Sequence, residues 1–541
     1  MYSQTNFTHP YRPIIWSIAG SDCSGGAGIQ ADIKTAQNLN CEICTLITAN
    51  TVQNSKEVLA IHPTDRQVLQ ASWACLMADK PPSAIKIGLL ANNHQLAWLC
   101  EILTELKQQR PQCMVVFDPV LKATVGQQLQ TETLETSLLI RLLKQVDVIT
   151  PNQPEAEKLY KLFTHHKAVN SEAENHDVAQ NNETDSMLKL GQSLNQVGIK
   201  GVLITGWHAI KQHQVIDVYS QKDATYALKS PQIATHFNHG SGCSFATALA
   251  SFLAQGYLMR DAFMQAKAFI NSSLGLSIKA EAASQTDNYY GALIQSTWPV
   301  ENTFFPTVMS LNSLHSLAAA DNLNPAAFLS CDSNNLGLYP VVDSLEWLQR
   351  LLPLGLEIIQ LRIKNQSPQQ LDSLIEKAVA LARRNQTRLF INDYWELAIK
   401  HQAYGVHLGQ EDLLEANLTA IQQAGLRLGI STHGCYEFKL AEQLKPSYLA
   451  IGAIFPTQTK DMTGQIQGLQ NLQQILAMQT SDIPVVAIGG INIKRAPQVL
   501  QTGVKSIAVV TAITQVKNPE KAIQDWQTLF AKNIGKLPLT N

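Results

Sequence analysis

Two glycine-rich segments in the first half of the chain have the composition of phosphate-binding turns. GSDCSGGAG runs from Gly20 to Gly28 after an apolar run, and GSGC runs from Gly240 to Cys243 at the start of an expected helix over about 241–255. Glycines let a backbone approach a ligand closely, and the first turn of a helix attracts anions and lowers the pKa of a thiol there. Taken singly, the first segment is equally well explained as a tight strand-to-helix turn. The second, alone, is better explained as a buried cysteine beside a glycine cap.

A third segment, TPNQPEAE at 150–157, places an amide and a carboxylate three residues apart. In a helical turn Asn152 and Glu155 lie on one side and suit a water-mediated Mg²⁺ site. Taken alone, this spacing is better explained as a helix N-cap with a capping acid.

In the second half, polar residues follow a series of short apolar runs. Arg362, Lys364 and Lys460 suit a multiply charged phosphate, whereas Asp393 and Asp412 suit Mg²⁺. Each residue alone is typical of a solvated loop, but their place after successive strands predicts one phosphate-ligand site. The full set of such positions is Gln360, Arg362, Lys364, Asn392, Asp393, Asp412, Ser431, Thr457, Lys460, Gly489, Gly490 and Thr511.

The apolar runs themselves predict the elements that position these residues. Eight strand-like runs separated by amphipathic stretches predict a (β/α)₈ barrel, with a doubly wound sheet as the second choice. The runs are 338–342, 356–364, 388–393, 404–409, 426–432, 448–455, 483–490 and 506–513.

The first half also alternates between strands and helices. Its pattern predicts an α/β domain with a mostly parallel sheet and an antiparallel edge, the edge formed by a hairpin over 214–220 and 224–230. The other expected strands are 14–20, 43–49, 57–63, 84–90, 114–120, 146–152 and 201–206.

The composition excludes several classes of protein. The 541 residues carry 41 Lys and Arg against 43 Asp and Glu, a balance that argues against nucleic-acid binding or electrostatic attachment to a membrane. No apolar run approaches the roughly 18 residues of a membrane span, and the N-terminus lacks the pattern of a signal or transit peptide. Nine scattered cysteines do not suggest a disulfide framework. We therefore expect a soluble, cytoplasmic protein.

Two polar stretches mark the expected organisation. Residues 165–187 are rich in Asn and Glu and predict a flexible loop. Residues 285–330 are rich in Ser, Thr, Asn and Pro and predict a domain boundary. We expect a first domain over 1–290, a linker over 291–333 and a second domain over 334–541.

Together, the segments of the first half resemble the ribokinase-like hydroxymethylpyrimidine/phosphomethylpyrimidine kinases over roughly residues 12–290. The resemblance implies that Gln53 binds the aminopyrimidine edge, that Leu89 covers its ring, and that Gly20 and Asp32 line the pocket. The segments that carry it are GSDCSGGAGIQAD, TANTVQN, GLL, DPV, TPNQPEAE and GSGC.

The same resemblance implies how phosphate is transferred. The N–H groups from Gly240 through Gly242 to Cys243 would hold the transferring phosphoryl group, and Cys243 would accept the hydroxyl proton or act through position alone. ATP would be the phosphoryl donor, with Mg²⁺. The residues expected to organise them are Asp118, Asn152 and Glu155.

The sequence departs from the kinase pattern at a few positions. The family's KGGH is TGWH here, at 205–208, the Ser-Gly after DPV is Val125-Gly126, and the Thr of GTGC is Ser241. The first two departures keep open a degenerate kinase half that only binds the pyrimidine. A pyridoxal-type kinase is a further alternative, against which Gln53 and Cys243 count.

Six segments over about residues 336–530 resemble thiamine-phosphate synthase, namely QLRIK, FINDYW, GVHLGQEDL, GISTH, PTQTK and AIGGI. The resemblance implies that Mg²⁺ on Asp393 and Asp412 helps to hold a leaving diphosphate, and that Lys460 is catalytic. The expected diphosphate ligands are Arg362, Lys364, Asn392 and Lys460.

The remaining barrel positions are expected to bind the rest of the substrates. Gln360 and Ser431 would contact the pyrimidine or its diphosphate. The thiazole phosphate would be received by Thr457, Thr459 and Gly490, with Thr511 as a further substrate contact.

Joined in one chain, the two resemblances predict a bifunctional enzyme of thiamine synthesis whose first half makes the diphosphate that its second half consumes. Its expected partners are small pyrimidine and thiazole phosphates rather than nucleic acid or membrane. A homodimer is one assembly we consider.

Overall fold

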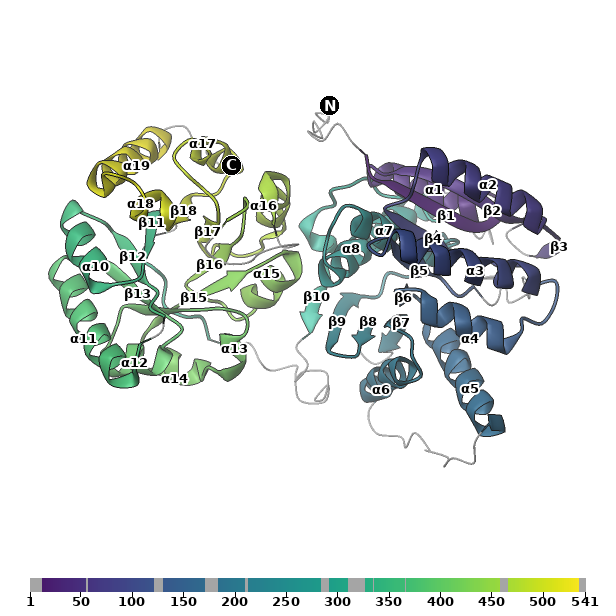
Figure 1. Ribbon diagram of the computed structural model, residues 1–541, viewed down its shortest axis with the longest axis horizontal. Coiled ribbons are helices and arrows are strands. Elements are labelled where there is room, and N and C mark those ends of the chain that lie inside the picture. The colour runs from purple at the N-terminus through teal and green to yellow at the C-terminus, as the bar shows by residue number, and fades with distance from the viewer. Residues whose placement is uncertain are drawn as a thin grey trace. The chain divides into compact units, whose positions relative to one another are not determined.

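The computed structural model describes residues 12–54, 57–120, 130–170, 183–209, 213–283, 291–309, 326–333, 335–364, 366–457 and 466–534. Of the side chains in these ranges, those of 165–170, 183–186, 207–209 and 533–534 are not described. The chain divides into two compact units, Met1–Asn322 and Leu323–Asn541, each with its own sheet (Figure 1). Within the described ranges, no helix has both the length and the apolarity needed to cross a membrane.

Unit 1 is built on a ten-stranded sheet in the order β10-β9-β8-β7-β6-β5-β4-β1-β2-β3. Its middle strands are parallel, whereas β3 and the β7 to β10 edge pair antiparallel. All nine strands expected from the sequence are present, and β10 is an additional one. Their bounds are β1 (Ile14–Asp22), β2 (Glu42–Gln53), β3 (Val58–Pro63), β4 (Ala84–Ile87), β5 (Met114–Phe117), β6 (Val148–Ile149), β7 (Gly201–Ala209), β8 (Gln214–Gln221), β9 (Ala224–Pro231) and β10 (Thr307–Met309).

The helices of unit 1 form two groups of neighbours. Helices α2 to α6 contact one another in succession, whereas α1, α7 and α8 contact each other, so the sheet lies between two helical layers. The helices are α1 (Gly28–Asn38), α2 (Arg66–Asp79), α3 (Asn93–Gln109), α4 (Thr136–Gln145), α5 (Gln153–Asn170), α6 (Glu183–Gln196), α7 (Ser241–Ala254) and α8 (Met259–Ala283).

The composition of residues 165–187 predicts a loop over the whole stretch, but both of its ends are helical. Helix α5 continues to Asn170, and α6 begins at Glu183. The residues between them lie outside the described ranges. Asn and Glu are tolerated in helices, and their low hydrophobicity alone is therefore a poor guide to where a helix ends.

Unit 2 is a closed barrel of eight parallel strands in sequence order, with β18 returning to pair with β11 (Figure 1). The predicted (β/α)₈ fold is confirmed, and each of the eight expected runs contains one strand. These are β11 (Gly337–Val342), β12 (Ile358–Leu361), β13 (Arg388–Asn392), β14 (Gly405–Leu408), β15 (Arg427–Thr432), β16 (Tyr448–Ile451), β17 (Val485–Ile488) and β18 (Ser506–Val509).

Helices surround the barrel, and the longer ones carry an apolar stripe toward the strands. In α11 the buried residues Leu371, Ile375, Ala378, Val379 and Ala382 recur at helical spacing. The barrel helices are α10 (Leu345–Leu351), α11 (Pro368–Arg384), α12 (Trp395–Lys400), α13 (Asp412–Glu415), α14 (Leu418–Gln423), α15 (Cys435–Glu442), α16 (Gly468–Met478), α17 (Ala496–Leu500), α18 (Thr511–Thr514) and α19 (Pro519–Ile534).

Both ends of the expected linker over 291–333 are packed. Thr307–Met309 form β10 on the sheet of unit 1, and Cys331 is fully buried in the core of the barrel. Residues 310–325 lie outside the described ranges. A Ser- and Asn-rich composition did not reveal these contacts, because the residues that make them are few and isolated in the sequence.

Two candidate active sites

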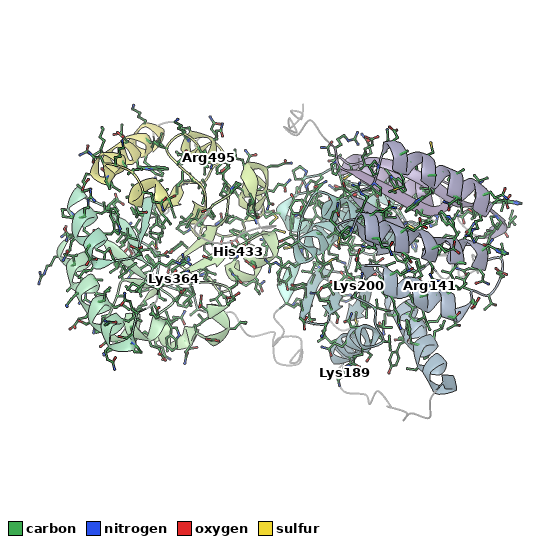
Figure 2. All side chains as sticks on the ribbon, viewed as in Figure 1. Arg141, Lys189, Lys200, Lys364, His433 and Arg495 are labelled. Atoms are coloured by element: carbon green, nitrogen blue, oxygen red, sulfur yellow. The ribbon has the colours of Figure 1, made fainter. Side chains whose placement is uncertain are left out.

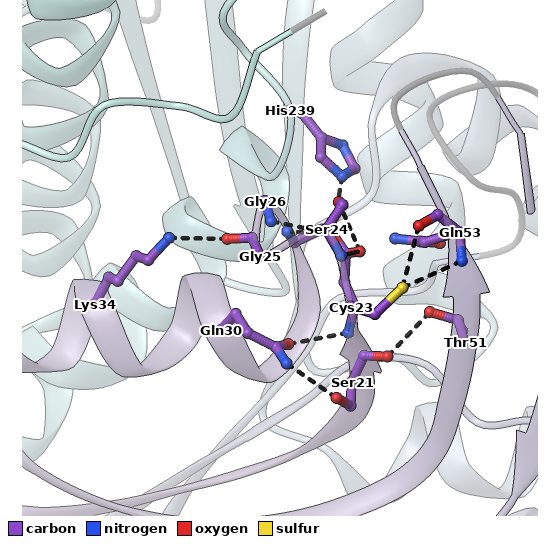
Figure 3. Close-up of polar contacts among 12 residues, drawn as sticks. Ser21, Cys23, Ser24, Gly25, Gly26, Gln30, Lys34, Thr51, Gln53 and His239 are labelled. Carbon is purple, nitrogen blue, oxygen red and sulfur yellow. Dashed lines mark hydrogen bonds and ion pairs between the residues drawn. The ribbon is translucent and has the colours of Figure 1, made fainter.

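The glycine-rich turn of unit 1 is organised by the carboxylate of Asp22. It accepts hydrogen bonds from the backbone N–H groups of Ser24, Gly26 and Ala27 at 2.8, 3.1 and 2.9 Å, respectively. Figure 3 shows the His239 ring directed toward this turn, on the side where Ser24 lies. Burial alone raises the pKa of Asp22, but hydrogen bonds led by the one from His239 hold it well below the usual range. The sequence analysis did not single out Asp22, although an Asp before Ser and glycines is typical of such a turn.

The two glycine-rich segments, more than 200 residues apart in sequence, meet in space. His239 Nε2 lies 3.0 Å from Asp22 Oδ2. At Gly240 the backbone φ is +83°, and a Cβ there would lie 1.9 Å from the carbonyl oxygen of Gly26. Any side chain at Gly240 would therefore separate the two turns.

A small pocket lies between these turns and is lined by four of the predicted residues, Gly20, Gln53, Leu89 and Cys243. A Cβ at Gly20 would lie 2.8 Å from Leu89 Cδ2, so the glycine makes room for the leucine against the pocket. Lys86 lines the same pocket and was not predicted.

Asp32 does not line the pocket, which corrects the expectation for this residue. Its side chain is fully buried and forms an ion pair with the Lys86 ammonium at 3.0 Å. Ser17 and Thr247 also donate hydrogen bonds to the Asp32 carboxylate. Asp32 therefore acts on the pocket through Lys86. The only trace of Lys86 in the sequence is a lysine inside the apolar strand AIKI.

The acid-base groups of this pocket also differ from expectation. Burial raises the pKa of the Cys243 thiol to about 12, although the Lys86 charge opposes this, so the thiolate predicted from the helix N-terminus is not favoured. Burial likewise raises the pKa of Asp118 to about 6, and the Cys243 side chain hydrogen-bonds this carboxyl. The helix dipole was outweighed because the thiol at the wall of the pocket loses contact with water and lies near the carboxyl groups of Asp118 and Asp32.

Asn152 and Glu155 cap the start of α5. The Glu155 N–H donates to Asn152 Oδ1 and the Asn152 N–H donates to Glu155 Oε2, both at 3.0 Å. This is the capping arrangement weighed against a metal site, and the metal role stays a prediction. Thr205 pairs with Asn152 on the neighbouring strand. Gly242 is exposed in the first turn of α7, whereas Val125 and the Trp207 side chain lie outside the description.

At the barrel, polar residues gather where the strands end. Gln360 and Asn392 are buried, Arg362 is half-buried and Lys364 is exposed. Figure 2 labels Lys364 within the ring of strands. The residues after parallel strands share one rim of a closed barrel, so Arg362, Lys364 and Asn392 lie at the same rim. Thr459 and Lys460 lie outside the described residues.

Asp393 and Asp412 lie side by side at this rim. Burial and, after it, the neighbouring Asp412 carboxyl raise the pKa of Asp393 to about 6, although Arg362 and Lys364 oppose the shift. Two adjacent carboxylates that resist joint ionisation suit a divalent cation, which would relieve their repulsion. Among the described residues no group of three or more metal-ligating side chains is found, so the pair would leave most coordination positions to substrate and water.

The last strands supply the predicted glycine turn. Gly490 has a φ of +61°, and a Cβ there would lie 2.5 Å from the carbonyl oxygen of Pro456. The Arg495 guanidinium donates to the Gly490 carbonyl at 2.7 Å and lies over the Phe455 ring. Arg495 was not predicted, because it follows the strand by seven residues. Thr457 is half-buried and Thr511 is exposed.

The barrel interior holds three polar residues that the sequence analysis missed, Tyr339, His407 and Tyr448. They form a hydrogen-bonded row that ends at the predicted residue Ser431. His407 lies in the GVHLGQEDL segment between the apolar residues Val406 and Leu408. Because side chains alternate between the two faces of a strand, this spacing is the sequence feature that places His407 inside the barrel.

Two family models match the chain. The phosphomethylpyrimidine kinase model matches residues 22–287 and the thiamine monophosphate synthase model matches residues 338–513. The chain is 59% identical over 197 residues to thiamine-phosphate synthase of Yersinia pestis (strain Pestoides F), covering 36% of this chain and 88% of the relative. It is 58% identical over 190 residues to that of Pectobacterium atrosepticum, covering 35% and 89%, respectively.

Among solved structures, phosphomethylpyrimidine kinase from Clostridium difficile 630 is 30% identical with a TM-score of 0.38, and covers 49% of this chain and 100% of its own. The match to the kinase model supports a kinase over the degenerate alternative. The chain therefore belongs to the phosphomethylpyrimidine kinase family in its first half and to the thiamine-phosphate synthase family in its second.

Proposed function

We propose that the chain is a bifunctional enzyme that phosphorylates 4-amino-5-hydroxymethyl-2-methylpyrimidine to its diphosphate and joins that product to a thiazole phosphate. The observation that carries the proposal is the presence of both families in one chain, because the product of the first reaction is a substrate of the second. We also propose that the two compact units, Met1–Asn322 and Leu323–Asn541, are a kinase domain and a barrel domain, in place of the expected 1–290 and 334–541.

In the kinase half, the substrate hydroxyl would attack the terminal phosphoryl group of ATP. Gln53 and Leu89 would hold the aminopyrimidine, and the N–H groups at the start of α7 would receive the transferring phosphoryl group. Lys86 would neutralise charge on it. Because the Cys243 pKa is raised to about 12, we assign this thiol a positioning role, and Asp118 is the better acceptor for the hydroxyl proton.

The expectation that Asp118 organises Mg²⁺ with ATP is the alternative role for this carboxyl group, because a carboxylate that holds the metal would not also accept the hydroxyl proton. Asn152 and Glu155 would help to organise the nucleotide phosphates. Mg²⁺ would supply charge neutralisation during transfer.

In the barrel, the bond between the methylene carbon attached to C5 of the pyrimidine and the diphosphate oxygen would break, and the diphosphate would leave with the electron pair. The thiazole nitrogen would then form the new C–N bond. Arg362, Lys364, Asn392 and Lys460 would stabilise the leaving charge, and Asp393 and Asp412 would hold Mg²⁺ against it. Thr457, Thr459, Gly490 and Thr511 would bind the thiazole phosphate.

Two assays on the purified full chain test the halves separately. With ATP, Mg²⁺ and the pyrimidine alcohol, we expect the mono- and diphosphate by ³¹P NMR, and their absence would exclude the kinase function. With synthetic pyrimidine diphosphate and thiazole phosphate, we expect thiamine phosphate, detected by its fluorescent thiochrome derivative. Pyridoxal in place of the pyrimidine is the control substrate, and its preferred phosphorylation would favour a pyridoxal-type kinase instead.

A further inference from the structure

A continuous chain of hydrogen bonds runs through the barrel interior to Ser431. The hydroxyl oxygens of Tyr339 and Tyr448 lie 2.9 Å apart, and the Tyr448 hydroxyl lies 2.7 Å from His407 Nδ1. His407 Nε2 lies 2.8 Å from Ser431 Oγ. Tyr339 and Tyr448 are each 1% exposed and His407 is 6% exposed, so water does not interrupt the chain.

Counting hydrogens gives this chain a direction. Burial raises the pKa of both phenols, and the Gln360 side chain, which hydrogen-bonds both, opposes this rise as a hydrogen-bond donor does. The Tyr339 hydrogen therefore has one acceptor among the described residues, the oxygen of Tyr448. The Tyr448 hydroxyl therefore donates its hydrogen to His407 Nδ1, which accepts it with a lone pair.

The direction continues to the end of the chain. A neutral imidazole whose Nδ1 accepts carries its hydrogen on Nε2, so His407 donates to Ser431 Oγ. The Ser431 hydroxyl hydrogen is not needed inside the chain. Burial, assisted by the nearby Arg362 charge, lowers the pKa of His407 to about 3, in agreement with a neutral ring.

We propose that Tyr448 and His407 are positioning residues that make the Ser431 hydroxyl a fixed hydrogen-bond donor to an acceptor atom of the bound pyrimidine diphosphate. This inference rests on the proposed synthase function of the barrel. A buried polar chain with every member satisfied costs little and gives one orientation, whereas an isolated serine hydroxyl rotates freely. The barrel thereby favours a ligand that has a hydrogen-bond acceptor atom beside the Ser431 hydroxyl.

Two matched substitutions test the direction of the chain. Tyr448→Phe removes the donor to His407 Nδ1 and frees the ring to change tautomer, so KM for the pyrimidine diphosphate is expected to rise about 10-fold. Tyr339→Phe removes an equally buried hydroxyl but leaves His407 as the one acceptor for Tyr448, so KM is expected to rise less than about 2-fold. KM for the thiazole phosphate is expected to change in neither variant.

Nitrogen NMR of the full chain labelled with ¹⁵N-histidine reads the tautomer directly. We expect His407, assigned by the loss of its signals in His407→Gln, to carry its hydrogen on Nε2 in the wild type and in Tyr339→Phe. A hydrogen on Nδ1 or a charged ring in the wild type would overturn the proposal. This readout needs no enzymatic activity.

The outcomes separate this inference from the proposed function. If the wild-type chain forms no thiamine phosphate from its two substrates, the synthase function fails while the tautomer still reports on the chain. If the wild type is active but the two phenylalanine variants have equal KM values, the positioning role fails. Thermal unfolding of both variants shows whether a rise in KM comes from a loss of folded protein.

Discussion

The Lys86 ammonium and the Asp32 carboxylate lie 3.0 Å apart, and neither side chain is exposed. Lys86 also lines the pocket between the two glycine-rich turns, whereas Asp32 lies behind it. A buried cation needs a buried partner, because neither water nor a mobile counterion can replace it. The pair thus fixes a positive charge at the pocket wall.

We predict that Asp32→Asn destabilises the chain because it leaves the Lys86 charge unpaired. Removing one partner of a fully buried pair costs roughly 3–5 kcal/mol of unfolding free energy. Chemical denaturation of the full chain measures this loss. The double variant Asp32→Asn/Lys86→Met serves as the control and is expected to recover much of the stability. Equal stability of the single variant and the wild type would contradict the pairing.

The raised pKa of Asp118 predicts a pH dependence of the kinase reaction. Since burial raises this pKa to about 6, Asp118 is ionised above pH 6 and protonated below it. If the carboxylate accepts the hydroxyl proton, kcat/KM for the pyrimidine alcohol should fall as the pH drops through about 6. The remaining activity of Asp118→Asn should lack this step. If kcat/KM of Asp118→Asn fell at the same pH as that of the wild type, the titrating group would be one other than Asp118.

The Asp393–Asp412 pair predicts a metal dependence of the barrel reaction. Asp393→Asn removes one carboxylate of the proposed Mg²⁺ site and is expected to lower thiamine phosphate formation roughly 100-fold. Asp525→Asn, on the exposed face of α19, is the matched control, and EDTA should abolish the reaction of the wild type. Isothermal titration with MgCl₂ and diphosphate checks the binding. Full activity of Asp393→Asn would refute the site.

We predict that a side chain at Gly240, where the two glycine-rich turns meet, lowers the stability of the chain. A Cβ at this position would lie 1.9 Å from Gly26 O at a φ of +83°, so Gly240→Ala should lower the unfolding free energy by more than about 2 kcal/mol. At Gly242 a Cβ meets nothing within 4 Å, so Gly242→Ala should fold with nearly wild-type stability. Equal unfolding midpoints for both variants would contradict the contact.

The barrel was predictable because each strand is a short, buried apolar run followed by a turn. Polar residues after those runs must share one rim, and this places Arg362, Asp393 and Asp412 together from sequence alone. The antiparallel strand β10 was not predictable, since three residues of a polar segment pair with β9 only through tertiary contact.

The kinase pocket was less predictable because its charges act through partners distant in sequence. Asp32 stands in a motif that suggests ligand binding, yet Lys86, Ser17 and Thr247 occupy its oxygens. The expected low pKa of Cys243 followed from the helix N-terminus and ignored burial, which the sequence does not display. The inward histidine and tyrosines of the barrel were missed for the same reason.

The most direct test of two linked activities is the formation of thiamine phosphate from the pyrimidine alcohol by the purified chain, with ATP, Mg²⁺ and the thiazole phosphate as the other reactants. We expect thiamine phosphate to appear with two ADP and one diphosphate for each molecule formed. Asp118→Asn and Asp393→Asn should each form thiamine phosphate far more slowly than the wild type, and mixing the two variants should restore most of the rate. Formation at the wild-type rate by either variant alone, or none by the wild type, would contradict the account.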